Sequence, residues 1–484
     1  MLVFALLAAA AAADAVEVGL DASVQTVADL AWDRPEEDRF EVVTRVRAEA
    51  SGPAGGGRWQ LGVLGEHQAR VGFERAGGDV EAAFELRPWE SGWEGPVGPA
   101  RLKVGHLVER WGRLDLLPVT DVLVGRDLRN GPLTPPQLVR QPAPLVRAQA
   151  GVERARAELT WMPFGARDRI ALEGTDAALL RQGQVSAALR EAATWDGDPL
   201  TQALLQDALT AGASGVDGLD TQLRQAAFGA LGESGRPDPL LGSSDLALRL
   251  EAEPRGVDVA LVGAWMRSRR PLPSAPEGLV GAMQTETLPG IADQEALLAV
   301  LADPTGLSWP RTWVGGAELA TTLGAVGLRA EGLYQSQVAV ARAWGRGATV
   351  PSVTGGVGLD WAWGTRLALV GEARAQWLLD PPPDLVLAAD VDPQLAGGAR
   401  LSLAGDRVSV EPGVVALLAF GEVAGRAEVR WRVTDAWELS GGAIVLSSPT
   451  DAPRSVQQAL TYTGGPVGAL SDTDAAWLTL RWIQ

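Results

Sequence analysis

The chain repeats stretches of about ten residues in which apolar and polar side chains alternate. In residues 425–434, one face carries glycine, alanine, valine and tryptophan, and the other carries Arg426, Glu428, Arg430 and Arg432. Successive side chains of a β-strand point to opposite faces, so this stretch has one apolar and one charged surface. A tilted strand of about ten residues also crosses a bilayer. The pattern recurs through most of the chain and predicts an all-β fold.

Short turn sequences separate many of these stretches, as at Ala404, Gly405 and Asp406. Glycine and aspartate tolerate the positive φ angles of tight hairpins, and strands joined so closely pair antiparallel. We therefore expect residues 16–484 to form an antiparallel up-and-down transmembrane β-barrel with about 16–18 strands. Long insertions near 163–243 and 267–310 carry helical spacing and proline and glycine stop signals, which predicts helical segments within long loops.

The first 15 residues are expected to be a signal peptide that is removed on export. An apolar core fills residues 2–13, and Ala13, Asp14 and Ala15 fit an A-x-A cleavage site. A buried N-terminal helix is the alternative. Export through the periplasm to the bacterial outer membrane fits the barrel prediction.

A soluble β-sandwich would show the same alternation, and three features favour the barrel over it. Many stretches are longer than the usual soluble strand. The last strand alternates up to Trp482, in a form similar to the terminal signal read by the outer-membrane assembly machinery. The chain also contains 18 tryptophans, many at strand ends, where indole suits a membrane interface in contact with outer-membrane lipid. The predicted girdle consists of Trp32, Trp59, Trp89, Trp161, Trp265, Trp377, Trp437 and Trp482.

One internal segment carries a recognisable motif. Residues 111–115 read WGRLD, residues 121–129 read DVLVGRDLR, and Trp161 to Phe164 follow. This order resembles a group of little-characterised bacterial outer-membrane proteins of the porin and alginate-export-like type. The resemblance implies a porin-like channel for passive or substrate-biased passage of a small solute whose identity it does not give.

The polar strand faces would line the lumen of such a barrel. In a wide pore they would set a field that biases which ions pass. Opposed arginine and glutamate on neighbouring strands could instead neutralise each other and brace the wall. The candidate pore-lining residues are Arg45, Arg47, Arg154, Arg156, Arg374, Arg426, Arg430, Arg432, Glu372 and Glu428, and the group around Arg426 is the best candidate for an anion-attracting patch.

The motif segment offers a candidate constriction. It is charged and irregular, so it could fold into the lumen as a narrowing, or it could be a packed, salt-bridged loop that closes one end. The residues concerned are Asp115, Asp121, Arg126, Asp127 and Arg129.

Composition narrows the function further. The net charge of −18 argues against nucleic acid as a partner, because phosphate binding needs a basic face. The absence of cysteine excludes thiolate metal sites, and the two histidines are far apart, so we expect no metal, no cofactor and no enzyme activity. A plugged barrel that serves as a surface anchor or binding protein is the main alternative, a secreted β-sandwich is a weaker one, and homo-oligomers are compatible with either membrane form.

Overall fold

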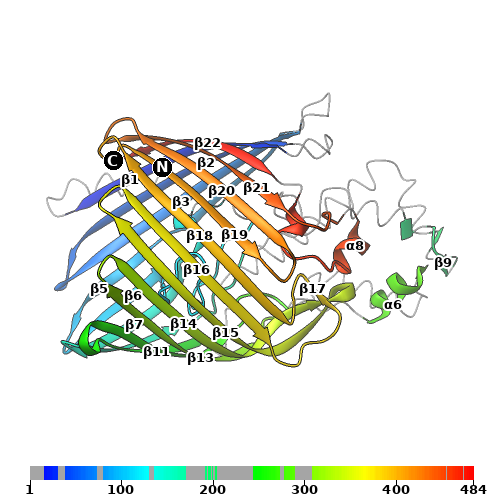
Figure 1. The fold of residues 1–484 in the computed structure, drawn as a ribbon, viewed down its shortest axis with the longest axis horizontal. Helices are drawn as coiled ribbons and strands as arrows, with labels where there is room; N and C mark the ends of the chain where they lie inside the picture. The colour runs from blue at the N-terminus through cyan, green and yellow to red at the C-terminus, as the bar shows by residue number, and fades with distance from the viewer. Residues whose placement is uncertain are drawn as a thin grey trace.

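A computed structural model of the chain shows a tilted barrel of long strands (Figure 1). The structure describes residues 16–30, 39–72, 80–129, 136–169, 244–272, 277–288, 308–453, 455–471 and 474–484, with a few short pieces between 134 and 203. The predicted signal peptide, Trp32 and most of the 163–243 insertion lie outside these residues.

Within the described residues, twenty strands form one antiparallel sheet that closes on itself. Strand β1 pairs with β2 on one side and with β22 on the other, where the register runs from Asp21 opposite Ile483 to Asp29 opposite Ala475. Strands β4 and β5 follow each other along β3, and β17 is a two-residue addition to β14, so the wall has 18 strand positions. The strands are β1 (Glu17–Asp29), β2 (Arg39–Ala54), β3 (Gly57–Gly72), β4 (Val80–Pro88), β5 (Ser91–Val97), β6 (Ala100–Leu107), β7 (Ala143–Val152), β8 (Ala155–Met162), β10 (Asp245–Ala252), β11 (Val257–Arg267), β13 (Arg311–Leu323), β14 (Val326–Arg342), β15 (Arg346–Trp363), β16 (Leu367–Leu378), β17 (Leu385–Val386), β18 (Val391–Leu403), β19 (Val408–Leu417), β20 (Glu422–Arg432), β21 (Trp437–Ser447) and β22 (Ala475–Ile483). The predicted antiparallel barrel and its strand number are confirmed.

Short helices lie in the connections between strands. They are α2 (Pro136–Val139), α6 (Glu277–Thr285), α8 (Val456–Leu460) and the 3-10 turns η3 (Pro254–Gly256), η4 (Ala343–Gly345) and η5 (Gly468–Leu470). Two two-residue strands, β9 (Asp196–Gly197) and β12 (Thr287–Leu288), pair apart from the barrel. No helix among the described residues is long and apolar enough to span a membrane.

The two ends of the barrel differ. Tight turns join the strands at the end where both termini lie, and the long connections extend from the opposite end (Figure 1). One tight turn, at residues 404–406, has the positive φ angles expected from its sequence, at Ala404, Gly405 and Asp406. Outer-membrane barrels have this same asymmetry of short turns and long loops.

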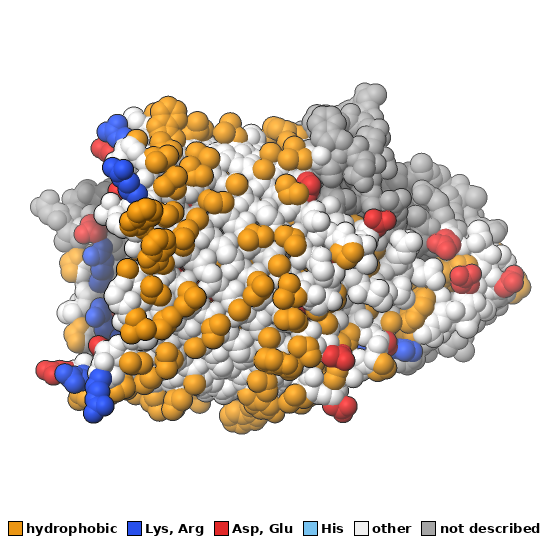
Figure 2. All heavy atoms as spheres, viewed as in Figure 1, with side chains coloured by type: hydrophobic (Ala, Val, Ile, Leu, Met, Phe, Trp, Pro, Cys, Tyr) orange, Lys and Arg blue, Asp and Glu red, His pale blue; other side chains and the backbone are white. Residues whose placement is uncertain are grey.

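The outer face of the wall is apolar, and the charged side chains point inward. On β13, Trp313 and Leu319 are exposed on the outside, while Thr312, Val314 and Glu318 are buried on the inside. Figure 2 shows apolar side chains spread over the middle of the wall and charged side chains gathered toward its two ends. Such a surface suits lipid, because it leaves no charge at the level of the hydrocarbon core.

Of the described tryptophans in the predicted girdle, all but one face outward. Six of its members alternate with inward residues and lie on the outer face near strand ends: Trp59, Trp161, Trp265, Trp377, Trp437 and Trp482. Trp89 was wrongly assigned to the girdle, since its side chain is only 2% exposed and packs against Leu64 and Leu138 inside the barrel. It follows Glu85 and Arg87 on the inward parity of β4, which explains its position.

Candidate functional site

A segment of chain enters the barrel after β6. This inner segment, residues 108–142, carries the WG and DLR motifs and is described except at 130–133 and 135. Its Trp111, Leu114 and Leu123 are at most 1% exposed and belong to the same core as Val314 and Leu333 of the inner wall. Apolar packing inside the lumen therefore holds one side of the segment against the β11–β14 wall.

Two glutamates of the wall bind the backbone of the inner segment. Glu331 of β14 accepts hydrogen bonds from the N–H groups of residues 113, 114, 119 and 120, with Val119 N at 2.9 Å and Thr120 N at 2.8 Å. Glu372 of β16 accepts the N–H groups of residues 115, 116 and 117 at 2.6–2.9 Å. Buried N–H groups need partners, and a carboxylate is the strongest acceptor available, so these two side chains fix the path of the segment.

A third glutamate completes this attachment. Glu318 of β13 accepts from Gly112 N at 3.1 Å and from the Thr120 hydroxyl at 2.9 Å, and it pairs with Arg249 at 2.5 Å. Glu318 and Glu331 stand directly opposite each other on neighbouring strands. Two like charges in that position would repel unless donors lay between them, and here the inner segment supplies those donors.

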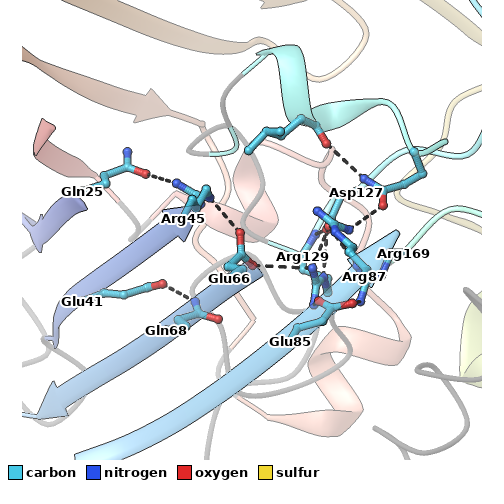
Figure 3. Close-up of polar contacts among 12 residues, drawn as sticks. Gln25, Glu41, Arg45, Glu66, Gln68, Glu85, Arg87, Asp127, Arg129 and Arg169 are labelled. Atoms are coloured by element: carbon cyan, nitrogen blue, oxygen red, sulfur yellow. Dashed lines mark hydrogen bonds and ion pairs between the residues drawn. The ribbon is translucent and has the colours of Figure 1, made fainter. Parts of the chain in front are cut away.

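An arginine and aspartate cluster attaches the other side of the inner segment (Figure 3). Asp127 contacts Arg129 at 2.7 Å, Arg87 at 3.3 Å and Arg169 at 3.5 Å. Glu85 of β4 joins the same cluster through Arg169 at 2.6 Å and Arg129 at 3.1 Å. Burial raises the pKa of Asp127, but the hydrogen bonds and charge of Arg129, with Arg169 and Arg87, outweigh burial and hold that pKa well below its ordinary value.

The cluster continues along the wall. Arg129 lies 3.7 Å from Glu66 of β3, Glu66 pairs with Arg45 of β2 at 2.8 Å, and Arg45 donates to Gln25 of β1 at 2.8 Å (Figure 3). This row of polar contacts crosses the three neighbouring strands β3, β2 and β1. It braces the wall beside the inner segment, and Arg45 is only 5% exposed within it.

All five candidate constriction residues lie in the inner segment. Asp121 pairs with Arg140 at 2.7 Å and lies 3.7 Å from Arg126, and Asp115 binds Arg329 of β14 at 2.5 Å. Burial tends to raise the pKa of Asp115, but Arg329 and Arg110 lower it below its ordinary value. The structure combines the two sequence interpretations, because the segment is inside the barrel and is also salt-bridged. Its role as a constriction stays a prediction.

The inner segment leaves a cavity beside the opposite part of the wall. We call this part, the inner faces of β1, β2 and β20–β22, the open half. Its cavity is bounded by Gln137 and Leu138 of the inner segment and by five arginines and three carboxylates: Arg45, Arg47, Arg426, Arg430, Arg481, Asp21, Glu428 and Glu438. Cations therefore exceed anions along this surface, although the whole chain is acidic.

Ion pairs order these arginines. Arg426 and Arg430 each contact Glu428 at 2.7 Å, on either side of it along β20. Asp21 binds Arg481 across the closing seam at 2.6 Å, and it binds Arg47 of the other neighbouring strand, β2, at 3.4 Å. Asp21 and Glu428 thus each hold two guanidinium groups, which keeps the arginines extended along the wall. Arg47 and Arg430 have second carboxylate partners, Glu49 at 3.2 Å and Glu411 at 3.4 Å.

The remaining candidate residues do not lie in this cavity. Arg154 was wrongly placed on a strand face, since it lies in the exposed turn between β7 and β8. Glu372 was wrongly expected to face the pore, because it is 4% exposed and bound to the inner segment. Arg156 pairs with Glu251 near the tight-turn end. Arg432 ends β20 on its inner parity, and Arg374 lines a separate pocket.

Sequence reasoning did not foresee which side chains attach the inner segment, chiefly Glu318, Glu331 and Arg87. The inward parity of the two glutamates was visible in the alternation, and their opposition across β13 and β14 follows from the short turn between these strands. Among the described residues, no group of three or more histidine, cysteine, aspartate or glutamate side chains could hold a metal ion.

Comparisons with known proteins give likeness of architecture alone. No family model matches the chain, and no curated protein does. Pseudomonas aeruginosa OccK5 (OpdH) is 10% identical over 97% of this chain and 98% of its own, with a TM-score of 0.46. Pseudomonas aeruginosa OccK7 (OpdD) is 9% identical over 98% and 99%, also at 0.46, and a porin is 9% identical over 97% and 100%, at 0.36. At these values the likeness carries no argument about function.

Proposed function

We propose that this chain is a bacterial outer-membrane channel through which small solutes pass along the open half of the lumen. The observation that carries the proposal is a closed barrel, apolar outside, whose inner segment occupies one part of the lumen and leaves a polar cavity beside the rest. A closed barrel satisfies every backbone group of the wall, as a lipid environment requires. Long loops would face the outside of the cell, as in other outer-membrane barrels.

We further propose that the channel favours anions. Five arginines and three carboxylates line the cavity. Because the surrounding wall has a low dielectric constant, the electric field of the extra arginines reaches across a narrow passage. Ion pairs reduce this field, including those of Arg45, Arg47 and Arg430 with glutamates outside the cavity lining, so the proposed preference rests on the arginines that face the cavity itself. Arg426 and Arg430 are the side chains that carry most of the proposed preference.

Several narrower statements belong to the same proposal. They are removal of residues 1–15 on export, recognition of the last strand by the outer-membrane assembly machinery, a homo-oligomeric form, and membership of the alginate-export-like group. A plugged barrel that acts as a surface anchor is the second candidate. The cavity beside the open half favours the channel over the plugged barrel.

Single-channel recording in a planar bilayer tests the proposal. The refolded chain should give stable open steps, with reversal potentials in a salt gradient that show anion preference. Arg426→Gln with Arg430→Gln should reduce that preference and leave open steps in place. Insertion without conductance would refute the channel and favour the plugged barrel, whereas unchanged selectivity in the double variant would refute the role of the two arginines.

A further inference from the structure

A second pocket lies on the loop side of the inner segment, away from the open half. The inner faces of β14, β15 and β16 form its wall, and residues 118–128 and 268–270 form its other side. Four arginines line it, together with the amide side chains of Gln335, Gln337 and Gln376. They are Arg126, Arg269, Arg270 and Arg374, of which Arg269 is paired with Asp245 at 2.6 Å.

Arg374 is the unusual member of this pocket. Its guanidinium makes no hydrogen bond or ion pair with any described residue, and its Nε atom has no contact with solvent. Confining a cation in this way is costly unless an anion compensates it. Arg270 and Arg126 are close enough to add like charge, which increases the cost. Other arginines of the inner wall, such as Arg249 and Arg329, have carboxylate partners within 2.5 Å.

The carboxylates in and around the pocket have partners other than Arg374, and one of them, Asp121, also lies 3.7 Å from Arg126. Asp121 pairs with Arg140 at 2.7 Å, and Asp168 accepts the backbone N–H of Arg126 at 2.8 Å. Glu331, on the wall beneath the pocket, is bound to the backbone of the inner segment. Asp392 of β18 stands opposite Gln376 and accepts from Gln394 through Oδ2 at 2.5 Å, while its buried Oδ1 has no hydrogen-bond partner among the described residues. None of these groups pairs with Arg374.

A β-bulge shapes the wall of the pocket. The register of β14 against β15 shifts between Gln335 and Val338, and the extra residues include Gln337, whose backbone N–H donates to Thr312 at 3.2 Å. Bulges turn side chains away from the regular alternation and are frequent beside binding sites. Gln335, Gln337 and Val338 all line the pocket, so the bulge brings side chains of both parities to its wall.

We infer that this pocket binds the carboxylate or phosphate group of a small solute, with the Arg374 guanidinium as its principal contact. Arg126 and Arg270 supply further charge, and the glutamine amides supply neutral donors. Planar guanidinium groups suit both oxyanions, since each accepts two parallel N–H bonds. The inference extends the proposed function, because it gives solutes a binding site separate from the arginines of the open half.

Calorimetric titration of the refolded chain in detergent, at constant ionic strength, tests this site with two probes, inorganic phosphate and succinate. Binding of either probe is expected and identifies which oxyanion the site takes. Arg374→Gln should weaken it about 10-fold, in keeping with the loss of one charge-assisted contact. Arg374→Lys should retain more of the affinity, and it also controls for misfolding. Arg255→Gln, the same charge change in an exposed tight turn, should leave binding unchanged.

Two results would overturn the inference: no binding of either probe to the parent chain, or equal binding by Arg374→Gln. Conductance is recorded separately in potassium chloride. A parent chain that binds a probe but does not conduct refutes the proposed channel and leaves the site standing. A chain that conducts but binds neither probe refutes the site alone.

Discussion

Replacement of Glu331 should release part of the inner segment while leaving the barrel closed. The carboxylate accepts four backbone N–H groups, two on each oxygen, and Oε2 also accepts the Thr120 hydroxyl at 3.1 Å. In Glu331→Gln, one oxygen becomes an NH₂ group, which cannot accept. Two N–H donors of the segment then face another donor, whichever way the amide is turned.

The size of the effect follows from the burial of these donors. Leu114, Val119 and Thr120 are 1%, 4% and 0% exposed, so water cannot replace the lost acceptor. Each unsatisfied buried donor costs about 1–3 kcal/mol, and two of them cost about 2–6 kcal/mol. At roughly 1.4 kcal/mol for each factor of ten, the detached fraction should rise at least about 30-fold. Glu372, Glu318 and Asp127 still hold neighbouring residues, so the detachment should stay local.

Thiol labelling measures this detachment directly, because the chain contains no cysteine of its own. Val119→Cys places a thiol at a buried position of the segment. In rapid pre-equilibrium, its labelling rate follows the detached population, so Glu331→Gln should raise that rate about 30-fold or more. Glu438→Gln is the matched control, since Glu438 faces the open half. Equal labelling rates in Glu331→Gln and the control would refute the argument.

Two further predictions concern pH and the lipid face. Burial raises the pKa of Glu109, and the ion pair with Arg147 only partly offsets this, so the folded state is favoured while Glu109 is protonated and loses that advantage as pH rises through the folded pKa. Glu109→Gln should therefore match the parent in acid and melt at a higher temperature near neutral pH. An equal or lower melting temperature near neutral pH would contradict this prediction. Leu261→Arg, on the outer face in the middle of β11, should lower the free energy of unfolding from vesicles by about 2–4 kcal/mol. Leu323→Arg, near the tight-turn end, should lower it by only about 0–1 kcal/mol. Equal costs would argue against the proposal that the middle of β11 lies in the hydrocarbon core.

The wall of the barrel was largely predictable from the sequence. Alternation at Arg426, Glu428 and Arg430 gives the same inward face in the structure, because a strand between lipid and water permits only one arrangement of apolar and charged sides. The tight turns were predictable for a similar reason, since few residues tolerate positive φ. Trp89 shows the limit, because its place at a strand end suggested lipid while its parity directed it inward.

The inner segment was only partly predictable. Its charges suggested either a constriction or a packed loop, and sequence alone could not choose, because the partners of Asp115 and Asp127 come from distant strands. The hydrogen bonds that attach the segment to the wall glutamates also cannot be predicted from its own sequence. Backbone N–H groups donate them, and almost any residue would supply the same donor. The information lies in the wall glutamates, whose purpose becomes clear only once the register opposes Glu318 to Glu331.

The two parts of the lumen use their charges differently, and this makes their effects separable. On the covered side, Glu331 and Glu372 are occupied by backbone donors, so their replacement should change where the inner segment lies and hence the size of the passage. On the open half, Arg426 and Arg430 are held by Glu428 and carry no part of the segment, so their replacement should change selectivity while the passage keeps its size. Conductance and reversal potential would therefore respond to different sets of residues. A glutamate substitution that altered ion preference without altering conductance would show that the two parts are electrostatically coupled.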